Sequence, residues 1–198
     1  MKRHLLPLVS LLLLFSLALT ACRIPFPGRS SQPQFTLSAD AQQATLTDQD
    51  GNPFRMSELQ GKLTMLFFGY TNCPDVCPAT LAIWKQVENS LGDEAEQVRF
   101  VFVTVDPERD TPERMKKHVS LFSDDFIGLT GNYDELLPIY QAYNVYHERG
   151  EESDSAAGYL VSHTASSFLL DKEGTSQARF KFGATPNEMV EEIRSYLQ

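Results

Sequence analysis

Two long apolar runs mark the centre of the chain. Residues 63–70, LTMLFFGY, and residues 98–106, VRFVFVTVD, are almost continuously hydrophobic and have the length of strands. Such runs are typical of strands that are covered on both faces of a sheet. FIGLTG, at residues 126–131, predicts a further strand. The pattern therefore predicts a central sheet with helices over it.

Helical periodicity alternates with these runs. Apolar residues spaced by three and four, together with capping residues, predict helices at 79–91, 111–122, 134–143 and 185–197. Thr111 is placed as an N-cap with Pro112 as first helical residue, and Thr185 and Glu188 have the spacing of a capping box. The helix at 134–143 contains a proline.

Turn signals complete the order of elements. DQDGN at residues 48–52 predicts an N-terminal hairpin, and DKEG at 171–174 joins two strands within residues 164–183. Ser57 and Gln60 also have capping-box spacing. The order predicts an α/β fold with a mixed central sheet flanked by helices and an N-terminal hairpin extension. This order fits a thioredoxin-like domain.

The first 34 residues have a different composition. Residues 1–21 start with basic residues and continue with an apolar run, which predicts a signal peptide. The run is about 15 residues, shorter than the roughly 20 that span a bilayer. LTAC resembles a bacterial lipobox, so Cys22 is the predicted lipid anchor, with a plain secretory peptide as the alternative. Residues 22–34 then form a flexible tether, and residues 35–198 form one globular domain.

The charge excludes one class of partner. The chain carries a net charge of -9. Without residues 1–21 it has 15 basic against 26 acidic residues, a charge of -11. Such a surface repels nucleic acid and anionic lipid, so no nucleic-acid partner is expected. We expect an exported protein in the periplasm or extracytoplasmic space, tethered to a membrane through the lipid.

Cys73 and Cys77 lie at the predicted junction between a strand and a helix. The unpaired N–H groups at a helix start favour thiolate, which serves both redox chemistry and metal binding. An oxidising compartment would allow a disulfide between them, but a bridge across so short a loop adds little stability. The pair is therefore interpreted as reactive, and the residues alone leave redox and metal binding open.

His163 is the candidate third ligand. It stands just before the terminal hairpin, where a thioredoxin carries a cis-proline against its cysteine pair. His118 and His147, in contrast, are expected to be solvated, on a helix face and in a polar loop. Two thiolates and one imidazole suit copper, whereas structural zinc normally has a fourth protein ligand.

Asp106 and Asp110 flank a predicted loop in TVDPERDTPE. The simpler interpretation is a turn former and a neighbour of a helix cap. The alternative is a role behind the metal ligands or in docking, with the two aspartates and the loop at 143–155 bordering a surface for a partner protein.

Three motifs, GYTNCPDVCP, VTVDPERDTPE and VSHTASSFLLD, together resemble the SCO/SenC family of membrane-tethered copper-binding proteins. The resemblance runs from about residue 35 to 197. It implies copper, one ion per chain, held by Cys73, Cys77 and His163 and passed to the dinuclear copper centre of cytochrome c oxidase. Ser162 stands where the family commonly has aspartate, and Asn72 where relatives often have histidine.

Two functions from different classes remain. The leading hypothesis is a metallochaperone without turnover of its own. The rival is a thiol-disulfide oxidoreductase that uses Cys73 and Cys77 as its redox pair, for instance to keep the oxidase cysteines reduced, in which His163 would be dispensable. A thiol peroxidase is the weakest alternative, because a peroxidatic cysteine needs no partner histidine on a distant strand.

Overall fold

The structure is a computed structural model that describes residues 38–154 and 158–197. Its elements are α2 (Ala39–Gln43), β1 (Thr45–Asp48), β2 (Pro53–Arg55), the 3-10 helix η1 (Met56–Leu59), β3 (Leu63–Gly69), α3 (Val76–Leu91), the 3-10 helix η2 (Gly92–Gln97), β4 (Val98–Thr104), α4 (Pro112–Val119), β5 (Ile127–Thr130), α5 (Tyr133–Ala142), β6 (His147–Arg149), β7 (Val161–His163), β8 (Ser166–Leu170), β9 (Ser176–Lys181) and α6 (Pro186–Leu197).

The central sheet is mixed, as the sequence predicts. Across the described residues its strands lie in the order β2-β1-β5-β4-β3-β8-β9. Strand β4 is parallel to β3 and β5, and the other neighbours are antiparallel. Strands β6 and β7 form a separate antiparallel pair.

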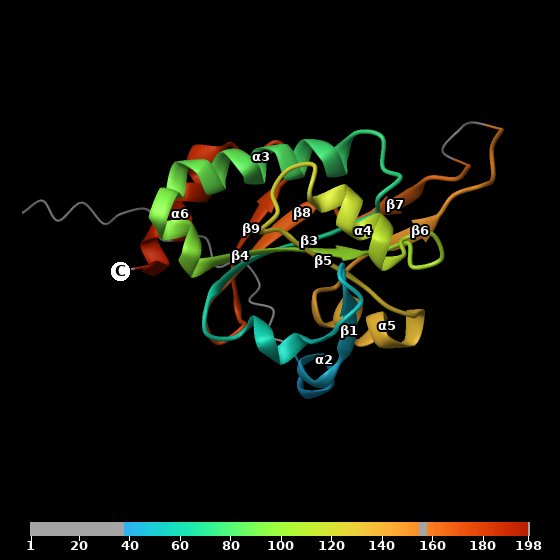
Figure 1. The fold of residues 1–198 in the computed structure, drawn as a ribbon, viewed down its shortest axis with the longest axis horizontal. Coiled ribbons are helices and arrows are strands. Elements are labelled where there is room, and N and C mark those ends of the chain that lie inside the picture. The colour runs from blue at the N-terminus through green and yellow to red at the C-terminus, as the bar shows by residue number, and fades with distance from the viewer. Residues whose placement is uncertain (1–37, 155–157, 198) are drawn as a thin grey trace, which may run out of the picture. The chain divides into compact units, whose positions relative to one another are not determined.

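Helices cover both faces of the central sheet. Figure 1 shows α3 and α6 along one face and α2 and α5 against the other. Every residue of β3 is buried, and successive side chains point to opposite faces. Phe67 packs edge-on against Trp84 of α3, while Phe68 packs against Tyr140 of α5. Both faces of the strand are thereby filled by aromatic rings.

Most predicted turns and caps are confirmed. The hairpins β1–β2 and β8–β9 form where DQDGN and DKEG predict them. The Thr111 hydroxyl accepts a hydrogen bond from the backbone N–H of Arg114, and Thr185 and Glu188 cap α6 reciprocally. Each cap supplies partners for N–H groups that a helix start leaves unpaired.

Two local predictions are wrong. Helix α3 begins at Val76, three residues before the predicted start, and contains Pro78 in its first turn. Proline is tolerated there because the N–H groups of the first turn have no partner within the helix, so the missing N–H costs nothing. The capping box at Ser57 does not form. Instead, the backbone N–H of Arg55 donates to Oε1 of Glu58 at 2.8 Å, which caps the short helix η1.

The predicted signal peptide, the anchor Cys22 and the tether to residue 34 lie outside the described residues. In the part of the chain that the structure describes, no helix combines the length and the apolar character needed to cross a membrane.

Candidate metal centre

The two cysteines meet at the start of α3. Strand β3 ends at Gly69, a short loop follows, and Cys77 lies in the first turn of the helix. The backbone N–H of Cys77 points at Sγ of Cys73 over 3.5 Å. Cys77 is fully buried, Cys73 is half-buried, and both are free thiols.

His163 reaches the sulfurs because of the sheet register. Strand β8 runs antiparallel to β3 and pairs Ser167 with Phe67, so the start of β8 lies beside the end of β3. His163 ends β7, immediately before β8. Its Nε2 is 3.6 Å from Sγ of Cys77, and one ligand atom from each of the three residues lies within 4.8 Å of the others.

The imidazole of His163 is oriented by its surroundings. Its Nδ1 lies 3.2 Å from the carbonyl oxygen of Thr164, an acceptor, which assigns the proton to Nδ1 and leaves Nε2 free to bind a metal. The rings of Phe67 and Tyr70 meet the imidazole edge-on, each with centroids 5.8 Å apart. Ser162 is exposed, and as a strand neighbour its side chain points away from that of His163. A backbone carbonyl therefore orients the ring, and position 162 does not.

Gly69 makes room for the buried sulfur. A Cβ atom at this position would lie 2.8 Å from Sγ of Cys77 and equally close to the rings of Phe67 and Phe102. Even alanine would displace one of these groups. The close approach of the strand backbone thus fixes where the Cys77 sulfur lies.

The two thiols differ strongly in acidity, which corrects the expectation that the helix start favours thiolate at both. The hydrogen bond from the Cys77 thiol, aided by the backbone N–H groups at the start of α3, lowers the pKa of Cys73 to about 3. Burial raises the pKa of Cys77, and the neighbouring Cys73 raises it further. Without a metal, Cys73 carries the thiolate and Cys77 its proton.

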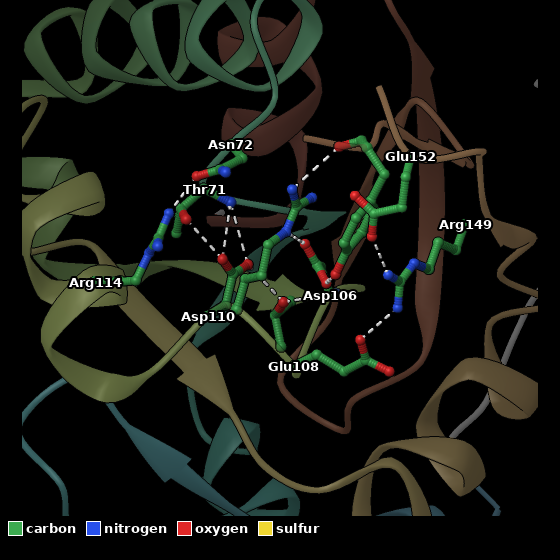
Figure 2. Close-up of polar contacts among 11 residues, drawn as sticks. Thr71, Asn72, Asp106, Glu108, Asp110, Arg114, Arg149 and Glu152 are labelled. Carbon is green, nitrogen blue, oxygen red and sulfur yellow. Dashed lines mark hydrogen bonds and ion pairs between the residues drawn. The ribbon is translucent and has the colours of Figure 1, made fainter. Parts of the chain in front are cut away.

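Asp110 fixes the loop that carries Cys73. Its carboxylate accepts hydrogen bonds from the backbone N–H of Thr71 at 3.1 Å and from the hydroxyls of Thr71 and Thr104 at 2.6 and 2.7 Å. Burial raises the pKa of Asp110. Asn72 is anchored separately, through its Oδ1, by Arg114 (Figure 2).

Asp106 belongs to a second group of polar contacts. It accepts hydrogen bonds from Nε of Arg109 at 2.5 Å and from the hydroxyl of Tyr159 at 2.7 Å. Asp106 is 4% exposed and Asp110 is 1% exposed. A docking partner would therefore not touch either carboxylate directly. Whether the two aspartates support the metal ligands or border a docking surface stays a prediction.

The expectation that the other histidines are solvated is also wrong. The ring of His118 lies 5.3 Å from that of Phe102, and burial lowers its pKa. His147 lies in β6, and its ring packs 4.5 Å from that of Tyr140. One ring nitrogen of each has no hydrogen-bond partner in the described structure. Both histidines have charged or polar neighbours in the sequence, which led to the prediction of a solvated position. The ring of each nevertheless packs on the buried side of its helix or strand, which those neighbours do not indicate.

Four residues near the site were not singled out in the sequence: Gly69, Tyr70, Arg109 and Tyr159. Gly69 ends an apolar strand directly before the cysteine loop, and Arg109 lies between the two aspartates, so each carried a positional signal. The contacts of Tyr70 and Tyr159 join segments far apart in the chain and leave no local pattern.

The arrangement defines a class: an α/β protein with an open site of two sulfurs and one imidazole, able to hold a soft metal ion. The SCO1/SenC family model matches residues 36–198. An SCO2-like protein of Rickettsia conorii is 33% identical over 150 residues, covering 76% of this chain and 73% of its own. The chain belongs to the SCO1/SenC family.

Solved structures agree with this assignment. ScoI of Bradyrhizobium japonicum, solved with copper bound, is 38% identical, with a TM-score of 0.71 over 77% of this chain and 96% of its own. A SCO1/SenC family lipoprotein of Bacillus anthracis is 25% identical, with a TM-score of 0.67 over 78% of this chain and 92% of its own. These structures confirm the thioredoxin-like fold and the resemblance to the family.

The difference in acidity predicts selective alkylation. In the folded, reduced, metal-free protein at about pH 6, iodoacetamide should modify Cys73 at least about 10-fold faster than Cys77, because thiolate is the nucleophile and Cys77 is also buried. Peptide mass spectrometry follows each cysteine, and urea-unfolded protein is the control in which the two rates converge. Equal rates in the folded protein would contradict the assignment.

Proposed function

We propose that this protein is a metallochaperone that binds one copper ion through Cys73, Cys77 and His163. The observation that carries the proposal is the convergence of their ligand atoms to within 4.8 Å, from two separate parts of the fold, the start of α3 and the end of β7. Two soft sulfurs suit Cu(I), and an imidazole supports Cu(II), so the site is able to hold either state. Among the described residues no further histidine, cysteine or carboxylate joins this group, so an incoming ligand could complete the coordination.

The recipient is the dinuclear copper centre of cytochrome c oxidase during its assembly. Family membership supports this step, as does the copper in the Bradyrhizobium relative. The half-buried Cys73 offers the more accessible sulfur, so a recipient thiolate would displace copper from that side while Cys77 and His163 release it last. Transfer by ligand exchange breaks no covalent bond within the protein and leaves the oxidation state of the ion unchanged.

Copper titration tests the proposal. Wild type should bind one equivalent, and Cys73→Ser and Cys77→Ser should each lose Cu(I) affinity by at least about 100-fold because a thiolate is removed. His163→Ala should weaken Cu(II) about 100-fold and Cu(I) about 10-fold or less. Competition with chelators of known affinity measures both states. Ser162→Ala, an exposed neighbour, is the matched control and should behave as wild type.

Normal copper affinity in either cysteine variant would contradict this function. The lowered pKa of Cys73 specifically favours one other activity, thiol-disulfide exchange through the cysteine pair. Rapid reduction of a protein disulfide by the metal-free form, undiminished in His163→Ala, would support that oxidoreductase instead.

The chaperone is also proposed to be exported and anchored through a lipid on Cys22, with residues 22–34 as the tether. The lipobox-like LTAC and the description of the Bacillus anthracis relative as a lipoprotein support this. Cys22→Ala should move the protein from the membrane fraction to the soluble fraction, because the acyl chains supply the membrane affinity. Cys73→Ala should stay with the membrane. If Cys22→Ala remained in the membrane fraction, the proposed lipid anchor would be contradicted.

A further inference from the structure

Tyr159 fastens the strand that carries His163 to the loop after β4. Its hydroxyl donates a hydrogen bond of 2.7 Å to Oδ1 of Asp106, and its carbonyl oxygen accepts one of 3.1 Å from Nη1 of Arg109. Tyr159 is buried. Both its side chain and its backbone are therefore fixed just before β7 begins.

The ring of Tyr159 lies between two guanidinium groups. Cζ of Arg109 is 3.5 Å from the ring centroid and Cζ of Arg149 is 3.8 Å from it. Two guanidinium groups this close to one centroid fit only on opposite faces of the ring. Cation–π attraction holds such a stack together, most strongly where water is excluded.

Acidic residues hold both guanidinium groups in place. Arg109 is paired with Asp106, and Arg149 is paired with Glu108 at 2.7 Å and with Glu152 at 2.5 Å. Figure 2 shows Glu108, Arg149 and Glu152 in line beside Asp106. Because Glu108 also belongs to the loop after β4, that loop holds the β6–β7 hairpin at two separate points.

The residues around Tyr159 are also connected to His163 through β6 and through Tyr70. Arg149 lies in β6 opposite Val161 of β7, so its contact with the Tyr159 ring joins the two sides of the hairpin. Cζ of Arg109 is also 5.8 Å from the ring centroid of Tyr70, whose ring meets the His163 imidazole edge-on. One aromatic ring that borders the imidazole, that of Tyr70, is thus in contact with Arg109.

We infer that Tyr159 is a positioning residue for the His163 imidazole. The four residues Asp106, Arg109, Arg149 and Tyr159, here termed the Tyr159 clamp, fix the backbone entering β7 and so keep the ring at the two sulfurs. Because imidazole supports Cu(II) more than Cu(I), the clamp determines how well the site holds Cu(II). This last consequence rests on the proposed function.

The test compares two tyrosines that each donate to a carboxylate. Tyr159→Phe removes the hydrogen bond to Asp106 but keeps the ring, and should weaken Cu(II) binding about 10-fold while changing Cu(I) binding about twofold or less. Tyr146→Phe removes an exposed hydroxyl bonded to Glu148 on the neighbouring strand, and should change neither. Arg149→Met, at an exposed site, should also weaken Cu(II) binding. It is the alternative test if Tyr159→Phe folds poorly.

A double variant separates positioning from general destabilisation. Tyr159→Phe in a His163→Ala background should cause no further loss of Cu(II) affinity, since the imidazole through which Tyr159 acts is absent. A further loss as large as in wild type would overturn the inference.

A metal-free measurement keeps the inference independent of copper. The ring resonances of His163 in NMR spectra of the apo protein should shift and broaden in Tyr159→Phe and stay unchanged in Tyr146→Phe. Unchanged resonances in Tyr159→Phe would overturn the inference even if the wild type binds copper. If the wild type binds none, the proposed function fails and these resonances alone decide the positioning role.

Discussion

The site depends on the antiparallel pairing of β8 with β3. Strand β3 ends at Gly69, and helix α3, which follows after a short loop, places the Cys77 sulfur beside that end of the strand. Because Ser167 pairs with Phe67, the chain entering β8 passes the same point, and His163 comes within 3.6 Å of the Cys77 sulfur. One strand register therefore brings together residues 86 positions apart in the sequence.

The three candidate ligands are held in place to different degrees, and the difference bears on the proposed metal transfer. Cys77 is packed against the backbone at Gly69 and its thiol retains its proton, whereas Cys73 is half-exposed and carries the thiolate. His163 is held by the Thr164 carbonyl and by aromatic edges. Two well-supported ligands and one accessible sulfur suit the proposed metallochaperone, which would have to bind copper firmly and still release it to a partner.

The sequence predicts the elements that depend on local patterns. The apolar run at β3, the proline and threonine that start α4, and the DKEG turn all have short-range causes, and all are found. The polar hairpin β6–β7 was missed, because HER and VSH carry too few apolar residues to predict strands. The three candidate metal ligands could be singled out because their residue types are chemically specific, and the structure brings their ligand atoms together. The burial of Asp106 and Asp110, and the stacking around Tyr159, follow from long-range contacts that no local pattern encodes.

X-ray absorption at the copper edge tests most directly whether the imidazole and both sulfurs meet on one ion. The spectrum of the copper-loaded protein should contain two sulfur scatterers and one imidazole, with the outer-shell features of the ring lost in His163→Ala. Two sulfurs without any imidazole contribution, in both Cu(I) and Cu(II) samples, would contradict the account.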